Sequence, residues 1–96
     1  MTIGIVGLGL IGGSFAKAYS DNDEHKVLAY NRSKEVIQAA YNDKAIDGEL
    51  NEGNIKDCDL ILLCLYPQLC IDYLTKMAPY IRKDAMAVSY THLRAH

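Results

Sequence analysis

The stretch that decides the fold reads Thr-Ile-Gly-Ile-Val-Gly-Leu-Gly-Leu-Ile-Gly-Gly-Ser and occupies residues 2–14. Its first part, Thr2–Val6, is a short apolar and β-branched run that stops at glycines, which is typical of a buried strand. Apolar residues then recur at helical spacing, namely Ile11, Phe15, Ala18 and Tyr19. This pattern stops at a polar cluster at residues 21–24. The stretch therefore predicts a strand, a glycine-rich turn and a helix over residues 10–20 in direct succession.

Strand and helix patterns alternate through the rest of the chain. Further strands are predicted at Lys26–Tyr30, Leu60–Leu65 and Ala85–Val88, and helices from about Lys34 to Asn42 and from about Gln68 to Met77. Residues 45–54 are open between a short strand and a turn. Because each connection is long enough for a parallel crossover, the order predicts an α/β fold with a parallel sheet and flanking helices. The pattern is that of the amino-terminal half of a Rossmann-like domain.

The glycine-rich turn carries the strongest chemical signal. Gly7-Leu8-Gly9-Leu10-Ile11-Gly12 has G-x-G-x-x-G spacing between a strand and a helix, the context that this motif needs in a dinucleotide-binding site. We expect Gly7 to permit the tight turn, Gly9 to leave room for a pyrophosphate, and Gly12 to let the helix pack closely on the strand. The alternative is that the glycines serve only the turn and the packing. Because glycine costs a helix roughly 1 kcal/mol relative to alanine, the sequence favours a site for the pyrophosphate of NAD or NADP at the helix start.

The residues after the second predicted strand bear on the choice between the two cofactors. Asn31 stands near where NAD enzymes carry an acid that grips the adenosine ribose, and a neutral amide would not repel a 2′-phosphate. Arg32 can pair with a phosphate or stack on adenine, and Ser33 adds a hydroxyl at a predicted helix start, which it can also cap. This trio favours NADP. The alternative is that Asn31 hydrogen-bonds the ribose of NAD and Arg32 is a solvated surface charge.

The end of the third long strand is a further candidate for the cofactor site. Leu65, Tyr66 and Pro67 lie at the predicted carboxyl edge of the sheet, where ligands of open α/β sheets bind. They are candidates to line the adenosine or nicotinamide ribose. The alternative is that Pro67 only begins the next helix.

Several other residues are expected to have structural roles. Asp57 and Asp59 precede a strand on the opposite edge of the sheet, where they are expected to cap a turn; the alternative is that these paired acids perform acid–base work. The helix residues Leu69, Ile71, Tyr73 and Leu74 are expected to face the core or a partner and not a substrate pocket. His25 lies in a polar turn and is expected to be solvated.

Composition excludes several classes of function. The chain has 96 residues and a formal net charge of −2, which gives no general electrostatic reason to bind nucleic acid or an acidic membrane. Cys58, Cys64 and Cys70 are odd in number and lack C-x-x-C spacing, so neither a disulfide framework nor a metal site is indicated. No signal peptide or membrane-spanning run is recognisable, and we expect a cytoplasmic protein.

Three segments together resemble the amino-terminal domain of prephenate dehydrogenases: residues 3–14, Ala29–Arg32 and Asp59–Pro67. The likeness spans roughly residues 2–88, and the Gly-Gly-Ser continuation of the glycine-rich turn is its most telling part. The resemblance implies an oxidoreductase of tyrosine biosynthesis that converts prephenate to 4-hydroxyphenylpyruvate by oxidative decarboxylation, with arogenate as the related substrate. It also implies that the intact parent is a homodimer in which a histidine accepts the hydroxyl proton and NAD or NADP takes the hydride.

The sequence departs from that family at two places. Family members often carry an acid where Asn31 stands. After Val88 they continue into a Ser-x-Lys segment and later a histidine–proline motif with the catalytic base, whereas Ser89–His96 resembles translated adapter or vector sequence. We therefore expect residues 1–88 to form part of an NAD(P)-binding domain and residues 89–96 to be a non-native or disordered tail. His92 is not assigned as the catalytic histidine, the catalytic residues stay unknown, and the fragment is expected to be inactive alone.

Two other functions stay open on the sequence. A dehydrogenase of the 6-phosphogluconate or hydroxyisobutyrate type fits the Ala-Tyr-Asn-Arg-Ser run at residues 29–33, although the glycine-rich turn and the Cys-Leu-Tyr-Pro run at residues 64–67 fit it less well. The second is a regulatory module that binds a dinucleotide without chemistry.

Overall fold

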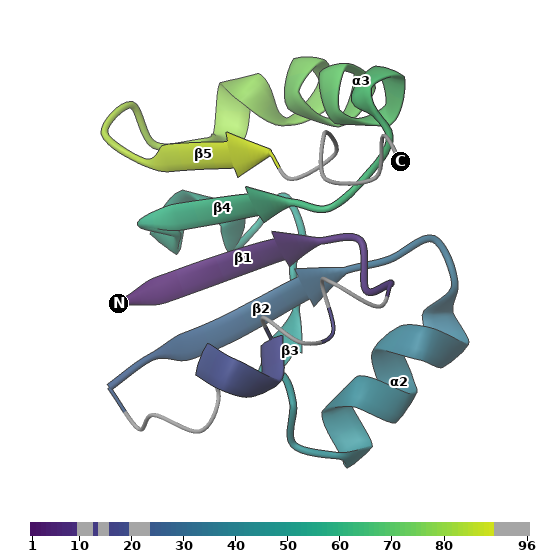
Figure 1. The fold of residues 1–96 in the computed structure, drawn as a ribbon. Coiled ribbons are helices and arrows are strands. Elements are labelled where there is room, and N and C mark those ends of the chain that lie inside the picture. Colours follow the sequence, from purple (N-terminus) through teal and green to yellow (C-terminus); the bar gives the residue numbers. More distant parts are fainter. Residues whose placement is uncertain (10–12, 14–15, 20–23, 90–96) are drawn as a thin grey trace.

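A five-stranded, all-parallel sheet forms the centre of the molecule (Figure 1). The computed structural model describes residues 1–9, 13, 16–19 and 24–89. The strands are β1 Thr2–Val6, β2 Lys26–Tyr30, β3 Gly48–Glu49, β4 Leu60–Leu63 and β5 Met86–Ser89. Their order is β3-β2-β1-β4-β5, so the direction of winding reverses between β1 and β4. In open α/β sheets the carboxyl side of such a switch point is where ligands bind.

Helices cover both faces of the sheet. The longer ones are α2, Lys34–Asn42, and α3, Pro67–Met77, and the short 3-10 turns η1 and η2 span Ile55–Asp57 and Ala78–Tyr80. Gly13 and residues 16–19 are helical as well. Cys70 and Met77 of α3 are buried on one face of the sheet. Ile37 of α2 and Ala16 of the earlier helical stretch are buried on the other. The predicted α/β class, a Rossmann-like parallel sheet with flanking helices, is confirmed.

Alternation of side chains along the strands feeds the two cores. Ile3 and Ile5 of β1 point to the α2 side and Val6 to the α3 side. In β4, Ile61 and Leu63 point to the α3 side and Leu62 to the α2 side. A parallel strand covered on both faces must be apolar at every position, which explains why β4 has no polar residue.

Most predicted elements have the expected bounds, and the differences have local causes. β4 ends at Leu63, two residues before the predicted end, because residues 64–66 form the turn that leads into α3. The ambiguous segment at residues 45–54 contains β3, preceded by the buried Ile46. Ser33 is the N-cap residue of α2, but its side chain makes no capping hydrogen bond. Ser89, assigned above to the tail, is the last residue of β5, and residues 90–96 lie outside the described part of the chain.

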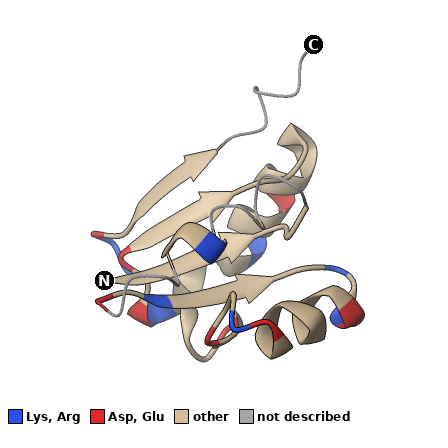
Figure 2. Ribbon diagram, turned by 60° about the horizontal axis from the view of Figure 1, so that its bottom comes forward, with Lys and Arg blue, Asp and Glu red and all other residues tan. Residues whose placement is uncertain are grey.

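Charged residues lie around the margins of the described fold. Figure 2 shows Lys and Arg interspersed with Asp and Glu on loops and helices, while the middle of the sheet is uncharged. Within the described residues, no helix combines the length and apolar character needed to cross a bilayer.

Candidate functional site

The turn after β1 has the tight geometry that Gly7 was expected to permit. Gly7 has φ 95°, a conformation that side chains with a Cβ rarely adopt, and its amide donates to the Tyr30 carbonyl at 2.8 Å. A Cβ at this position would lie 2.6 Å from the carbonyl oxygen of Cys64. Gly7 therefore lets the chain turn where β1, β2 and β4 approach one another.

Gly9 differs from Gly7 because the space beside it is open. A Cβ on Gly9 would meet no described heavy atom within 4 Å. The Gly13 amide donates to the Gly9 carbonyl at 2.8 Å, a hydrogen bond of helical i to i+4 spacing. Leu10, Ile11 and Gly12, the other predicted members of the loop, lie outside the described residues.

Asn31 joins the end of β2 to the glycine-rich turn. Its Oδ1 accepts a hydrogen bond from the Leu8 amide at 2.9 Å, so the side chain fixes the first part of the loop. The Asn31 amide nitrogen is the part of the side chain that remains to meet a ligand. Arg32 is exposed and makes no ion pair with any described residue.

A cavity of about 370 Å³ opens beside these residues, on the α3 side of the sheet. Its size falls in the range of small-molecule sites. The described lining comes from the ends of β1, β2 and β4, from the β3–η1 segment and from one side of α3: Gly7, Tyr30, Asn31, Arg32, Lys34, Glu49, Leu50, Asn51, Glu52, Leu65, Leu69, Asp72, Tyr73, Lys76 and Met77. Four of the predicted site residues thus meet at one cavity, namely Gly7, Asn31, Arg32 and Leu65.

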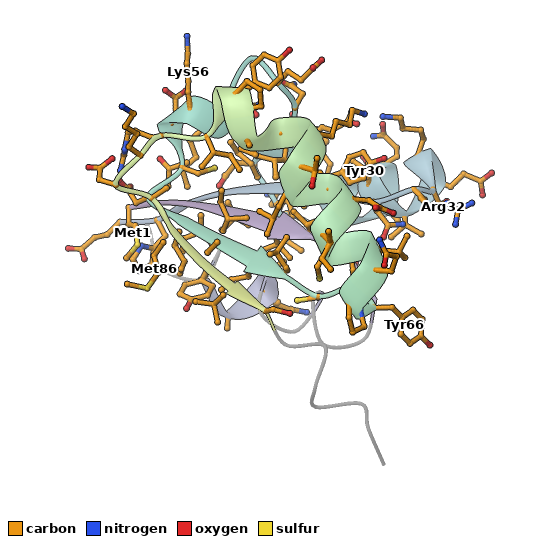
Figure 3. The ribbon with its side chains drawn as sticks, turned by 90° about the horizontal axis from the view of Figure 1, so that it is seen from above. Met1, Tyr30, Arg32, Lys56, Tyr66 and Met86 are labelled. Atoms are coloured by element: carbon orange, nitrogen blue, oxygen red, sulfur yellow. The ribbon has the colours of Figure 1, made fainter. Side chains whose placement is uncertain are left out.

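Other predicted site residues are placed next to the cavity or away from it. Leu8, Gly9 and Ser33 adjoin lining residues in the chain but are not part of the described lining. Tyr66 is 60% exposed and points outward beyond the start of α3 (Figure 3), and Pro67 is the first residue of that helix. Leu65 is held in place by its carbonyl, which accepts a hydrogen bond from Cys70 Sγ at 3.4 Å.

One face of α3 lines the cavity, in addition to the core packing that was expected of its residues and that Tyr73 and Leu74 show. Leu69, Asp72, Tyr73 and Lys76 line the cavity and follow helical spacing of three and four residues. Ile71 lies off this face and is 57% exposed. The signal was present in the sequence as a mixed face of two apolar and two charged residues, but without the position of β2 nothing indicated what that face meets.

Two tyrosines form the aromatic part of the wall. Tyr30 at the end of β2 and Tyr73 of α3 have ring centroids 5.7 Å apart and planes 34° apart. Burial raises the pKa of the Tyr73 hydroxyl well above its ordinary value, and this hydroxyl has no hydrogen-bond partner among the described residues. The Tyr73 side chain is therefore uncharged at neutral pH.

The charges of the lining are balanced. Its cations are Arg32, Lys34 and Lys76, and its carboxylates are Glu49, Glu52 and Asp72. Lys34 forms an ion pair with Glu49, and Asp72 accepts a hydrogen bond from Gln68 at 3.0 Å. The Glu52 carboxylate raises the pKa of the Tyr80 hydroxyl by accepting its hydrogen bond. Arg32 is thus the cation beside the end of β2 that no described carboxylate neutralises.

The opposite edge of the sheet is built for structure. The Asp59 carboxylate accepts hydrogen bonds from Arg82 at 2.6 Å and from the Thr2 amide at 2.8 Å. Both lower the pKa of the carboxyl, and the bond from Arg82 has the larger effect. His25 packs edge-on against Tyr19 with ring centroids 5.6 Å apart, so it is less solvated than expected.

The three cysteines are free thiols, and burial raises the pKa of Cys58 to about 11. No cluster of metal-ligating side chains occurs among the described residues.

The described residues fit a dinucleotide at the carboxyl edge. The open space at Gly9 leaves the backbone accessible, Gly7 and Asn31 hold the loop in place, and the cavity continues from Gly7 past Arg32 to an aromatic wall. A phosphate beside the loop and a base in the cavity would match the two kinds of surface.

Comparisons with known proteins agree with this geometry. The family model described as "NADP oxidoreductase coenzyme F420-dependent" matches residues 2–92. The solved structure of Synechocystis arogenate dehydrogenase is similar with a TM-score of 0.82 and 28% identity, over 93% of this chain and 32% of that one. Prephenate dehydrogenase from A. aeolicus, solved with hydroxyphenyl propionate and NAD+, gives a TM-score of 0.81 and 26% identity over the same shares. A Streptomyces aurantiacus imine reductase shares the fold at 18% identity and a TM-score of 0.77.

The chain spans about a third of the length of these solved structures. A comparison with curated protein sequences finds no match. The likeness to prephenate and arogenate dehydrogenases that the sequence indicated is confirmed. Because the family model covers nearly all of the sequence, the chain belongs to the NADP oxidoreductase family that the model describes, as a pyridine-nucleotide-binding dehydrogenase domain with a Rossmann-like sheet.

Proposed function

We propose that this chain binds NADP, and NAD less tightly, along the carboxyl edge of its sheet. The pyrophosphate lies on the loop Gly7–Gly12, the adenosine ribose meets Asn31, Arg32 and Ser33, and the base enters the cavity beside Tyr30 and Leu69. The observation that carries the proposal is that one cavity joins Gly7, Asn31 and Arg32. The segment Leu65–Pro67 flanks the same edge from the β4 side.

The preference for NADP rests on the charges at the end of β2. Asn31 brings no negative charge, and its Oδ1 is engaged by the Leu8 amide. Arg32 is exposed and has no described ion-pair partner, so its guanidinium can meet a 2′-phosphate. The side chain of Ser33 makes no capping bond to α2, which leaves its hydroxyl for the same phosphate.

We further propose that the parent protein is a prephenate or arogenate dehydrogenase. The likeness to two such enzymes at 26–28% identity supports this, together with the Gly-Gly-Ser continuation at residues 12–14. When bound, the nicotinamide accepts a hydride from the substrate. The residues of this chain bind and orient the dinucleotide, and none of them is assigned as the catalytic base. We therefore expect the 96-residue chain to bind cofactor without forming NADPH or NADH in the presence of prephenate.

The cofactor proposal is tested by titrating the chain with NADP+ and NAD+ in a calorimeter. Arg32→Ala should weaken NADP+ about tenfold, the scale of one lost charged hydrogen bond, and leave NAD+ nearly unchanged. Lys83→Ala is the matched control, because it removes an exposed cation distant from the cavity lining. Equal weakening of both dinucleotides by Arg32→Ala would reject the 2′-phosphate contact, and no binding of either by the unaltered chain would reject the proposed function.

The parent activity is tested on the source DNA. The reading frame beyond the codon for Val88 should continue into Ser-x-Lys and a histidine–proline motif. A frame that ends after His96 would favour the dinucleotide-sensing module instead.

A further inference from the structure

The ion pair between Lys34 and Glu49 lies in the wall of the cavity. Lys34 is the first residue of α2, two positions after Arg32, and Glu49 ends the edge strand β3. Both side chains line the cavity together with Tyr30, Asn31 and Arg32. Lys34 is 71% exposed and Glu49 36%, so the pair faces solvent and can exchange partners.

The pair changes the charge that a ligand meets at the start of α2. Without Glu49 the first turn would present Arg32 and Lys34 as two free cations beside Asn31. With Glu49 in place, one of the two is neutralised, and a carboxylate lies within contact distance of the same turn. A 2′-phosphate entering there gains Arg32, but it must either compete with Glu49 for Lys34 or accept a nearby negative charge.

Among the three carboxylates of the lining, Glu49 is the one bound to a cation of this turn. Asp72 accepts from Gln68 within α3, and Glu52 accepts from Tyr80. The other two therefore contribute to the general charge of the cavity, whereas Glu49 acts on the group that would meet the phosphate.

We propose that Glu49 is a specificity-determining residue that limits the preference for 2′-phosphorylated dinucleotides by holding Lys34. The inference rests on the proposed binding of NAD(P) with its adenosine ribose at Asn31–Ser33. It adds a determinant on β3, outside the glycine-rich turn and outside the residues that follow β2.

The test measures the ratio of NADP+ to NAD+ affinity by calorimetry on the full 96-residue chain. Glu49→Gln should raise this ratio about two- to fivefold, the scale of an exposed ion pair, with most of the change in NADP+ affinity. The double variant Glu49→Gln/Lys34→Gln should lose the gain, because Lys34 is the group that the substitution releases. The gain should also shrink as salt is raised, since exposed charges are screened.

Asp72→Asn is the matched control for charge. It removes one carboxylate from the same lining without touching Lys34, so the ratio should rise by less than in Glu49→Gln. A rise of equal size would show a general charge effect and would overturn the role given to Glu49.

The remaining outcomes separate the inference from the function on which it rests. If the unaltered chain binds a dinucleotide but Glu49→Gln leaves the ratio unchanged, the inference fails and the proposed function stands. If the unaltered chain binds neither dinucleotide, both fail. Should the glutamine variant unfold, Glu49→Lys takes its place and must raise the ratio above that of the unaltered chain. An unchanged ratio would overturn the inference equally.

Discussion

Gly7 and Gly9 are two positions apart, and the described backbone requires glycine at the first but not at the second. Gly7 combines φ 95° with a Cβ direction aimed at the Cys64 carbonyl, so any side chain there opposes the approach of β1 to β4. Gly9 has neither a positive φ nor a close neighbour among the described residues. No described atom would exclude a Cβ at Gly9, and the proposed pyrophosphate site supplies a reason for glycine there.

The requirement at Gly7 predicts a loss of stability on substitution. Gly7→Ala should lower the free energy of unfolding by about 2 kcal/mol or more, because the strained φ and the 2.6 Å contact with Cys64 add. Urea unfolding followed by circular dichroism measures the change. An alanine variant as stable as the unaltered chain would show that the turn can relax.

Asp59 makes the stability of the fold depend on pH. The hydrogen bond from Arg82, and then that from the Thr2 amide, hold the pKa of the folded carboxyl below its ordinary value. A carboxyl whose pKa is lower in the folded state contributes stability that is complete above the unfolded pKa and is lost as pH falls through the folded one. The contribution should therefore begin to fall below about pH 4 and be lost only at a lower pH, below the folded pKa.

The variant Asp59→Asn tests that dependence. It should be less stable than the unaltered chain at neutral pH, and the difference should narrow as the pH is lowered below about 4. Urea unfolding across this range measures it, with Asp43→Asn as a control for loss of an exposed carboxylate that has no described hydrogen bond of its own. A difference that stays constant with pH would contradict the account.

At the scale of elements, α2 ends in a C-terminal cap that could not be predicted from the sequence. The Lys44 amide donates to the Tyr41 carbonyl at 3.0 Å and the Ala45 amide to the Ala40 carbonyl at 2.9 Å, which is the hydrogen-bond pattern of a Schellman cap. Lys44 takes the left-handed position, φ 62°, where glycine is usual. With no glycine to mark it, the cap could be found only from the backbone.

The cap predicts a stabilising substitution. Lys44→Gly should raise the free energy of unfolding by about 1 kcal/mol, because glycine adopts a positive φ without the steric cost that a Cβ brings. Lys44→Ala, which loses the same side chain but keeps the Cβ, should give no such gain. Equal unfolding midpoints in urea for the two variants would rule out this explanation.

The regular elements were largely predictable because their signals are local. Strands β1 and β2 and helix α2 have the predicted bounds, since apolar runs and helical spacing state them directly. The sequence could not decide whether residues 45–54 contain a strand. A two-residue strand at a sheet edge needs little apolar character, and the position of β3 is set by the pairing of Gly48 with Leu28. The predicted helix at residues 10–20 is described only in part.

At the scale of the whole molecule, the site divides into a predictable part and a part set by topology. Gly7, Asn31, Arg32 and Leu65 were named from sequence because they end strands whose carboxyl ends share one edge. Glu49 and the cavity face of α3 were not predicted to line the site. They reach the cavity through the order β3-β2-β1-β4 and the crossing of α3 over the sheet, which no local pattern encodes.

The central claim is that the glycine-rich turn holds the pyrophosphate of a nicotinamide dinucleotide, and calorimetric titration of NADP+ into three forms of the chain tests it most directly. The unaltered chain and Gly48→Ala, whose added Cβ meets Leu28 at an ordinary 3.5 Å, should bind NADP+ alike. Gly9→Ala should unfold at the same urea concentration as the unaltered chain. It should bind NADP+ at least about tenfold more weakly, because its Cβ would lie where the pyrophosphate is proposed to bind. Undiminished binding by Gly9→Ala, or no binding by the unaltered chain, would contradict the account.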